Sequence, residues 1–196
     1  EKDDYKEVEV LTREAFWNVY RPGCSEHLVL HNLHHNNKSI EDLELVVECE
    51  GKIVGHIIYS KGNIDKSKDE TFITFGPVSV HPKFQRKEIG SKLIRISMQK
   101  AARLGYSAIF ITGDENYYKR FGFESASKYK IHLEGVPVED EAPFFMVKTL
   151  KEDALNNIEG FFIFDDCYNV NQDKVDEFDK KFEPKKKEKR AGQLEF

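Results

Sequence analysis

One interrupted strand limits the folds open to this chain more than any other feature. Residues 72–80 are mostly β-branched and aromatic, a composition typical of a strand, and Pro82 ends the run. Gly76 and Pro77 lie inside it, where a regular ladder is disfavoured because proline has no backbone N–H to donate. We therefore predict a β-bulge, with unpaired backbone groups and a gap beside the neighbouring strand. A ligand that carries amides can enter such a gap as an additional strand.

The turn that follows, residues 85–91, has the composition of an anion-binding helix start. It contains a basic pair, Arg86 and Lys87, and two small residues, Gly90 and Ser91, and we predict that a helix begins near Arg86. The first N–H groups of a helix have no partner within it, and the helix dipole favours negative charge at that end. The turn therefore predicts a site for a pyrophosphate.

Together, the strand and the turn resemble the acyl-CoA-binding motif of the GNAT superfamily of N-acetyltransferases. Gln85 and Gly90 hold the key positions of that motif, and Glu88 stands where the family usually has its first glycine. Acetyl-CoA is the co-substrate that the resemblance implies, and we expect the Glu88 carboxylate to point outward to solvent. The implied coenzyme-binding residues are Val78, Ser79, Val80, Gln85, Arg86, Lys87, Glu88, Ile89, Gly90 and Ser91.

A second stretch, residues 116–123, supports the same resemblance. It follows an apolar strand, residues 108–112, and it resembles the family's late motif, in which a tyrosine four residues before a glycine faces the coenzyme sulfur. Tyr118 has this spacing from Gly122, so the resemblance implies that Tyr118 donates a proton to the departing thiolate. The other interpretation of Tyr118 is a partly buried helix residue that packs beside Phe121.

The order of elements predicts the fold and its divisions. Strand, helix, strand and helix alternate in the middle of the chain, and 39% of the 196 residues are hydrophobic, enough for a real core. The resemblance implies an α/β fold with a mixed, mostly antiparallel central sheet flanked by helices. We expect a GNAT-like domain over residues 1–150, a strand and helix extension packed on it over residues 151–183, and a disordered basic tail over residues 184–196.

The segment before the hairpin is predicted to form one strand and two helices. The strand covers residues 8–11, the first helix covers residues 12–20, and Ser25 caps a second helix that ends near Asn36. In the resembling family, the matching helices form one wall of the acceptor site. Three aromatic residues either line that wall or belong to the core, and these are Phe16, Trp17 and Tyr20.

Histidines raise two questions about chemistry. His31, His34 and His35 lie on neighbouring positions of the second predicted helix, a spacing that holds a metal if a carboxylate joins them. No such ligand is evident from the sequence, so we predict solvated histidines and no metal.

His56 lies in a strand of the predicted hairpin, whose turn is Glu50-Gly51. It is either a general base near the acceptor amine or a packing residue.

Charge and cysteine usage limit the kinds of partner and the cellular location that we expect for the chain. The formal net charge is −5, which does not indicate nucleic acid, and no apolar run of about 18 residues indicates a membrane span. Three scattered cysteines without Cys-x-x-Cys spacing argue against a disulfide framework or a structural zinc site and favour a cytoplasmic location. The expected partner is a small-molecule or peptide amine, and the chain is expected to be a monomer or a homodimer.

The implied reaction is acetyl transfer from acetyl-CoA to a primary amine by direct attack in a ternary complex. The central strand contains no carboxylate, so the sequence names no general base. An acyl-CoA sensor without turnover would show the same strand and turn, and a protein-interaction domain would need neither. Turnover on an amine separates the first two classes, and coenzyme binding excludes the third.

Overall fold

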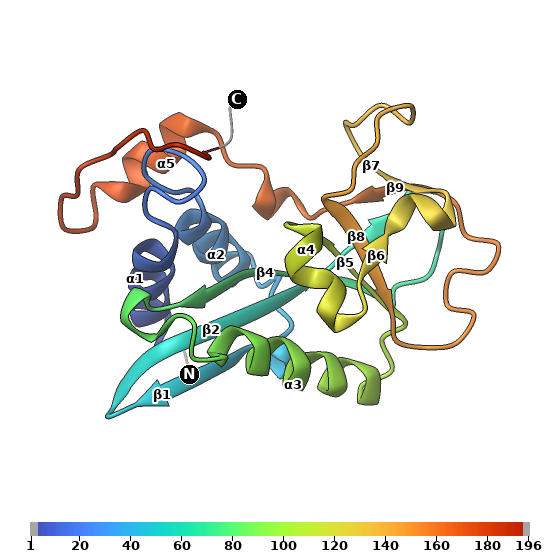
Figure 1. Cartoon of the computed structure of the whole chain (residues 1–196), viewed down its shortest axis with the longest axis horizontal. Helices are drawn as coiled ribbons and strands as arrows, with labels where there is room; N and C mark the ends of the chain where they lie inside the picture. The colour runs from blue at the N-terminus through green and yellow to red at the C-terminus, as the bar shows by residue number, and fades with distance from the viewer. Residues whose placement is uncertain (1–3, 194–196) are drawn as a thin grey trace.

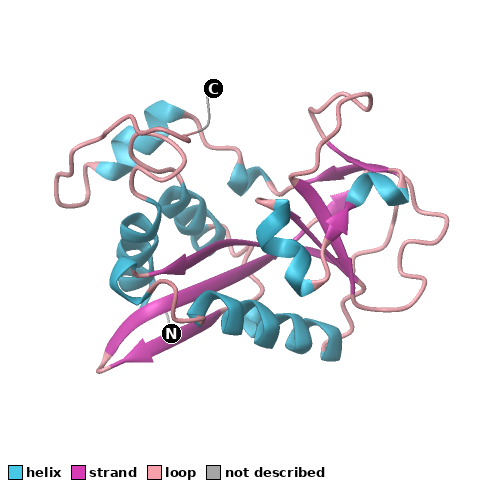
Figure 2. Cartoon of the chain, in the orientation of Figure 1, coloured by secondary structure: helices cyan, strands magenta, loops and turns pink. Residues whose placement is uncertain are grey.

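The computed structural model describes residues 4–193, in which the strands form two sheets flanked by helices (Figure 1, Figure 2). In spatial order, the larger sheet contains β1 (Leu45–Cys49), β2 (Lys52–Lys61), β4 (Phe72–Val80), β5 (Ala108–Thr112), β8 (Phe145–Thr149) and β6 (Glu124–Ser125). The smaller sheet contains β3 (Asn63–Ile64), β9 (Gly160–Ile163) and β7 (Ile131–Leu133). In the larger sheet only β4 and β5 pair in parallel. The predicted mixed, mostly antiparallel fold is confirmed.

Helices cover both faces of the larger sheet. They are α1 (Tyr5–Phe16), α2 (Glu26–His35), α3 (Ile89–Arg103), α4 (Glu115–Tyr118) and α5 (Gln172–Asp179). Tyr59 Oη of β2 lies 2.8 Å from Ser97 Oγ of α3, whereas the adjacent Ile58 packs with Leu30 of α2. Alternate β2 side chains therefore face α3 on one side of the sheet and α1 with α2 on the other. None of the helices within residues 4–193 combines the length and the apolar character needed to cross a bilayer.

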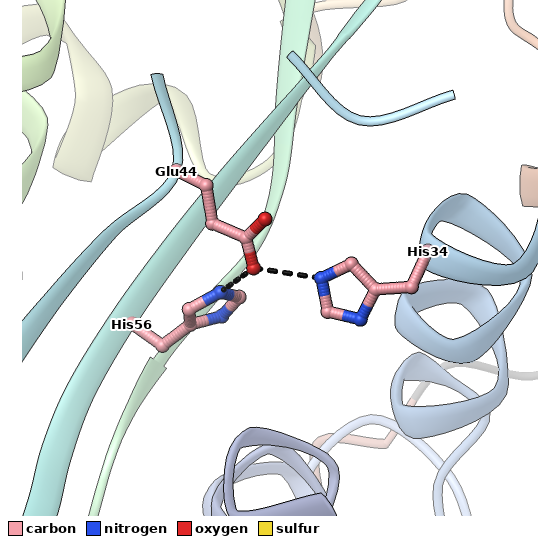
Figure 3. Close-up of side chains that lie close together, drawn as sticks. All are labelled: His34, Glu44 and His56. Carbon is pink, nitrogen blue, oxygen red and sulfur yellow. Dashed lines mark hydrogen bonds and ion pairs between the residues drawn. The ribbon is translucent and has the colours of Figure 1, made fainter. Parts of the chain in front are cut away.

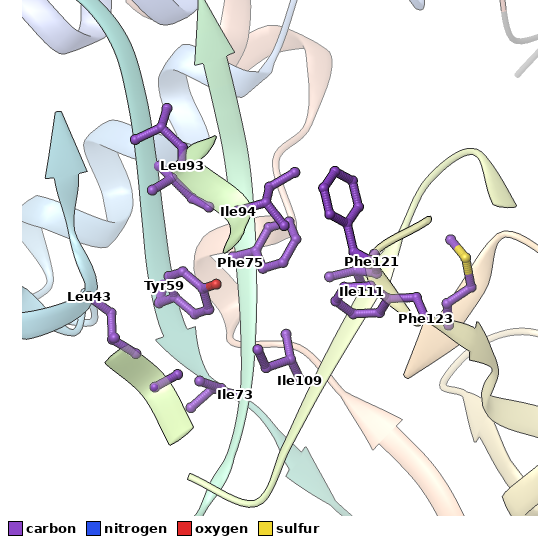
Figure 4. Close-up of a cluster of buried hydrophobic side chains, with 13 residues drawn as sticks. Leu43, Tyr59, Ile73, Phe75, Leu93, Ile94, Ile109, Ile111, Phe121 and Phe123 are labelled. Carbon is purple, nitrogen blue, oxygen red and sulfur yellow. The ribbon is translucent and has the colours of Figure 1, made fainter. Parts of the chain in front are cut away.

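The main core lies between α3 and the larger sheet (Figure 4). Leu93 and Ile94 point from α3 towards Tyr59 and Ile109 of the sheet. Burying each such aliphatic side chain stabilises the fold by about 1.5–3 kcal/mol, so this contact fixes the position of α3. Not every apolar residue of α3 faces this core, because Ile96 and Leu104 are exposed and the buried face contains Leu93, Ile94, Ser97 and Ala101.

The predicted strand over residues 8–11 is wrong, because these residues belong to α1. Val8 and Leu11 are buried, whereas Val10 between them is 42% exposed, so burial follows the helical period of 3.6 and not the strand period of two. The helix ends at Phe16 and not at residue 20. Ser25 does precede α2, but its hydroxyl makes no capping hydrogen bond.

The predicted hairpin is confirmed. β1 and β2 pair in antiparallel around Glu50 and Gly51, which have φ values of 52° and 72°. Two successive residues with positive φ are typical of a type I′ turn, whose twist matches that of the flanking strands. The smaller sheet was not predicted from the sequence; its strand β3 lies between β2 and β4 in the chain and pairs with β9.

The C-terminal extension packs against α1 and α2. Val175 and Phe178 of α5 form an apolar cluster with Leu28 of α2. Arg13 of α1 donates to both carboxylate oxygens of Asp179, with distances of 2.6 Å from Nε and 3.1 Å from Nη2. The helix of the C-terminal extension therefore docks on the rest of the domain.

Residues 184–193 also differ from the expected disordered tail, because they lie against the turn between α1 and α2. The Lys186 carbonyl accepts hydrogen bonds at 3.0 Å from the Trp17 indole N–H and from the Asn18 amide. Glu188 N–H donates to Asn18 Oδ1 at 3.0 Å, and Lys185 pairs with Glu14 of α1. Residues 194–196 of the predicted tail lie outside the described residues.

Candidate active site

The parallel pairing of β4 with β5 stops partway along β4. Residues 72–74 pair with residues 108–110, and no pairing with β5 is formed beyond Thr74 in the described chain. On its other edge, β4 stays paired with β2 as far as Val80. The register of that pairing shifts opposite Gly76 and Pro77, which is the predicted bulge.

The second half of β4 presents backbone N–H groups to an open edge. His81 N–H donates to Val54 O of β2 at 2.9 Å, which fixes the direction of the ladder bonds. Hydrogen-bonded and non-hydrogen-bonded pairs alternate along an antiparallel ladder. The amides of Val78 and Val80 therefore point away from β2, to the side from which β5 has separated.

Two further residues of β4 define the surroundings of this edge. Ser79 is buried, and its hydroxyl lies 2.8 Å from Thr12 Oγ1 of α1, so its side chain belongs to the α1 face. A Cβ placed on Gly76, at the bulge, would meet no atom of the described residues within 4 Å. There is thus space beside the bulge, next to the outward amides.

The N-terminus of α3 lies at the end of β4. Its first closing bond runs from Lys92 N–H to Glu88 O at 2.9 Å, so the N–H groups of residues 89–91 have no acceptor within the helix. Gln85 Nε2 donates to Val80 O at 3.2 Å and links the turn to the strand. The exposed cations of this turn are Arg86 and Lys87.

Gly55 of β2 allows α3 to begin this close to the sheet. A Cβ on Gly55 would lie 2.7 Å from Ile89 Cγ2 and 3.3 Å from Leu93 Cδ1, and real Cβ atoms do not approach other atoms as closely as the first distance. Glycine at this position therefore sets how near the first turn of α3 lies to the strand.

Glu88 adopts a backbone conformation that favours glycine. Its φ is 60°, in the left-handed region, and its side chain is exposed and does not cap α3. Residues with a Cβ are disfavoured there by contact with the following carbonyl oxygen. The resembling family has a glycine at this position, and the left-handed φ gives a physical reason for it.

Glu88→Gly is expected to stabilise the chain by about 1 kcal/mol, because it relieves the left-handed strain. For a chain of this size that corresponds to a rise in Tm of about 2–4 °C. Acetyl-CoA affinity is expected to change by less than about tenfold, since the carboxylate is exposed. Thermal unfolding and calorimetric titration at two salt concentrations measure both effects.

Arg86→Gly is the matched control for this variant, because Arg86 has the same φ of 60° and is also exposed. It should also raise Tm, but it should weaken coenzyme binding, since a cation is lost from the turn. A large gain of affinity in Glu88→Gly that shrinks as salt is added would show that the carboxylate faces the ligand.

Tyr118 lies in an aromatic cluster at the end of α4. Its ring centroid is 6.1 Å from that of Phe75 in β4 and 5.9 Å from that of Phe123. A Cβ on Gly113 would lie 2.5 Å from Tyr118 Cε2, so the ring packs directly on the Gly113 backbone. Burial, and then charge interactions with Tyr20 and Tyr117, raise the pKa of the Tyr118 phenol. The phenol therefore keeps its proton at neutral pH.

Tyr117 lies nearer to the predicted anion site than its sequence position suggests. A Cβ on Gly90 would lie 3.6 Å from Tyr117 Oη and 3.5 Å from Val80 Cγ2. The Tyr117 hydroxyl is thus beside the first turn of α3, in the same region as the open edge of β4.

The three aromatic residues of the predicted acceptor wall have different surroundings. Trp17 is only 9% exposed and donates to Lys186 O, so the C-terminal segment covers it. Tyr20 is 48% exposed, and its pKa is raised by burial and then by Glu26, Asp114 and Tyr117. Phe16 is half-buried, and its ring centroid lies 6.1 Å from that of Tyr20. Tyr20 is therefore the member of this set that lies near Tyr118.

His34 and His56 meet at one carboxylate on the α1–α2 face of the sheet (Figure 3). Glu44 Oε1 lies 2.7 Å from His34 Nε2 and 2.9 Å from His56 Nε2. Burial alone raises the pKa of Glu44, but the hydrogen bonds from the two imidazoles outweigh it and lower that pKa to about 2. For His56, burial lowers the pKa of the imidazole, and this effect outweighs the hydrogen bond and the charge of Glu44, which would raise it. His56 is fully buried, and His34 is buried as well, so the prediction of solvated histidines in α2 is wrong for His34.

Sequence reasoning missed Gly113, Tyr117 and Glu44. Glycine directly after an apolar strand is a signal for close approach of another group, so Gly113 was detectable in principle. Tyr117 follows from no local pattern, because its hydroxyl position depends on where α4 sits relative to α3. Glu44 lies ten residues from His34 and twelve from His56, so only the folded chain brings the three together.

The comparison with protein families agrees with this geometry. The acetyltransferase (GNAT) domain family matches residues 41–125, a stretch that includes the hairpin, the bulged strand, α3 and α4. The uncharacterized N-acetyltransferase YjhQ of Escherichia coli is 30% identical over 100 residues, which cover 50% of this chain and 55% of YjhQ. The uncharacterized N-acetyltransferase YhbS of the same organism is 24% identical over 162 residues, which cover 83% of this chain and 91% of YhbS.

Solved structures show the same fold. The crystal structure of E. coli YhbS in complex with CoA has a TM-score of 0.76 and 24% identity, and the match covers 86% of this chain and 88% of YhbS. A GNAT family acetyltransferase from Brucella melitensis in complex with acetyl-CoA has a TM-score of 0.68 and 25% identity, with coverage of 86% and 94%. Residues 41–125, which include the separated end of β4 and the helix start beside it, thus match a GNAT acetyltransferase domain, and the chain has the fold of these two solved acetyltransferases.

Proposed function

We propose that the chain transfers an acetyl group from acetyl-CoA to a primary amine by direct attack within a ternary complex. The observation that carries this proposal is the open edge of β4, which runs from the bulge to the free N-terminus of α3 and passes Tyr118. Acetyl-CoA supplies an activated acetyl group on a long arm that contains amides. The outward amides of Val78 and Val80 match such an arm.

The start of α3 is the proposed pyrophosphate site. The free N–H groups of residues 89–91 converge there, and the helix dipole favours an anion at this end. Arg86 and Lys87 add positive charge, and Gln85 holds the turn to the strand. Ser79 lies between the two outward amides but faces α1, so it positions its neighbours and makes no side-chain contact with the ligand in this proposal.

Tyr118 is the proposed proton donor. The amine nitrogen bonds to the carbonyl carbon, the carbon–sulfur bond breaks, and the Tyr118 phenol gives its proton to the sulfur. The raised pKa means that the phenol is present in its protonated form at neutral pH. The phenolate regains a proton from the amine nitrogen or from solvent, so the chain is unchanged after each turnover.

The proposed acceptor is a small-molecule or peptide amine that enters beside Tyr20. This exposed ring interacts electrostatically with Tyr118, and open space adjoins Gly76 at the bulge. Tyr20 is therefore the residue that we place at the acceptor end of the site.

Coenzyme binding is the first test. Saturating acetyl-CoA, at a hundredfold excess over Kd, is expected to stabilise the chain by about 2.7 kcal/mol. That corresponds to a rise in Tm of about 5–10 °C for a chain of this size. Desulfo-CoA and dephospho-CoA should raise Tm less, and the absence of any shift with acetyl-CoA would contradict the proposal.

Turnover separates transfer from sensing. A panel of polyamines, amino acids, peptide N-termini and simple amines is incubated with acetyl-CoA, and released CoA is separated from the protein before thiol detection, because Cys49 is a half-exposed free thiol. Acetylated product should form with at least one amine. Binding without transfer would favour an acyl-CoA sensor, for which the carboxylate of Glu88 in the anion-binding turn is the one structural argument.

A further inference from the structure

Three side chains from separate elements converge on a point away from the open edge of β4. His34 lies in the last turn of α2, Glu44 precedes β1, and His56 lies in β2 (Figure 3). One ligand atom from each residue, two imidazole nitrogens and a carboxylate oxygen, lies within 4.8 Å of the other two. Within residues 4–193 this is the only such group of three.

The cluster is buried in a way that simple packing does not explain. The His34 and His56 side chains are 2% and 0% exposed, and the Nδ1 atoms of both are buried without a hydrogen-bond partner. A buried polar atom without a partner costs about 1–3 kcal/mol. Apolar residues of similar size would avoid both penalties, so the cluster as it stands costs stability.

The ligand set selects a class of ion. Two imidazole nitrogens with one carboxylate oxygen form a set found in zinc sites that keep an open position for water and in non-haem iron(II) sites, and of these ions we favour zinc because it needs no redox partner. Magnesium and calcium prefer oxygen ligands, so they do not match this site. A carboxylate and neutral imidazoles are the forms in which these side chains bind a divalent cation.

The two separations between the imidazole nitrogens and the carboxylate oxygen require only a small adjustment. In a tetrahedral zinc site with bonds of about 2.0–2.1 Å, neighbouring ligand atoms are about 3.3 Å apart. The present separations from Glu44 Oε1 are 2.7 Å and 2.9 Å, so the atoms must move apart by about half an ångström. The Glu44 side chain is 16% exposed, so solvent reaches the carboxylate.

We propose that His34, Glu44 and His56 form a zinc-binding site that ties α2 to the first two strands of the sheet. The zinc ion would take the place of the two imidazole N–H protons, which now both point at Glu44 Oε1. His56 and Ile58 point to the α1–α2 face, whereas Ile57 packs with the α3 side of the sheet. The site is therefore distinct from the acetyl-transfer site, and the proposal does not depend on the proposed function.

Zinc binding is tested on the untagged full chain after treatment with a chelator. Competition with a chromophoric chelator of micromolar affinity is expected to show one zinc ion per chain, and magnesium should not compete. Long-range proton–nitrogen NMR gives a second readout on the unmodified sequence. Zinc should move the proton of both imidazoles from Nε2 to Nδ1, and failure of the parent chain to take zinc from the chelator would overturn the proposal.

Variants assign the ligands. Glu44→Gln keeps the size of the side chain but removes the anionic ligand, and His34→Gln removes one nitrogen ligand, so each should weaken zinc binding at least about tenfold. His35→Gln is the matched control, because His35 is the adjacent residue and is exposed. If Glu44→Gln and His34→Gln bind zinc as tightly as the parent, the site is elsewhere and the proposal is wrong. Should a variant fail to fold, the NMR readout on the parent decides.

Discussion

Tyr118→Phe is expected to lower kcat for acetyl transfer by about 10²-fold, with little change in the Kd of acetyl-CoA. The substitution removes only the hydroxyl that is proposed to protonate the sulfur, and loss of a general acid lowers rates by about 10²–10⁴-fold. A hundredfold loss corresponds to about 2.7 kcal/mol of transition-state stabilisation. The aromatic contacts with Phe75 and Phe123 remain, so the fold is retained. Steady-state kinetics and calorimetric titration give the two constants.

The control for this variant is Tyr106→Phe. Tyr106 also packs against the main core, but it follows the C-terminal end of α3, far along the helix from the proposed pyrophosphate site. Tyr117 cannot serve as the control because its hydroxyl lies beside Gly90. Equal kcat values for Tyr118→Phe and the parent would remove Tyr118 from the mechanism.

Gly113→Ala is expected to lower kcat by about tenfold to 10²-fold without removing any functional group. The new methyl group would lie 2.5 Å from Tyr118 Cε2, so the ring must move by about 1 Å to reach a normal contact distance. A displacement of this size at a reacting group reduces rates by up to about 10²-fold. Gly113 has no left-handed φ, so alanine adds no backbone strain. Acetyl-CoA affinity should stay within about threefold of the parent.

A double-mutant cycle separates this effect from general disruption. If Gly113→Ala acts by moving the Tyr118 hydroxyl, it should have little further effect on kcat in the Tyr118→Phe background. Independent, multiplicative losses in the double variant would show that Gly113→Ala acts through some other part of the site. Thermal unfolding of all four proteins identifies any loss of stability.

Local patterns were enough to predict the central elements of the site. Gly76-Pro77 predicted the bulge because proline removes a ladder bond wherever it occurs, and Glu50-Gly51 predicted the hairpin because a type I′ turn needs positive φ at two residues. The strand and helix on either side of residues 85–91 follow from composition. The roles of the coenzyme-binding residues and of Tyr118 stay predictions until the variants are measured.

Other parts depend on contacts that no short pattern encodes. The segment Val8-Glu9-Val10-Leu11 has the β-branched content of a strand, but tertiary packing buries only its helical face. The Glu44 carboxylate reaches two histidines from different elements, and residues 184–193 find hydrogen-bond partners on Trp17 and Asn18. Sequence reasoning fails at these places because the decisive partner is distant along the chain.

The contact of residues 184–193 with the α1–α2 turn affects the timing of folding during synthesis. Lys186 O and Asn18 Nδ2 are separated by 168 residues, so α1 and α2 leave the ribosome well before these partners have been synthesised. Until then Arg13 has no Asp179 to pair with, and the C-terminal segment does not yet cover Trp17. The helix pair beside the proposed acceptor site is therefore completed only after residues 179–186 have been made, long after its own residues.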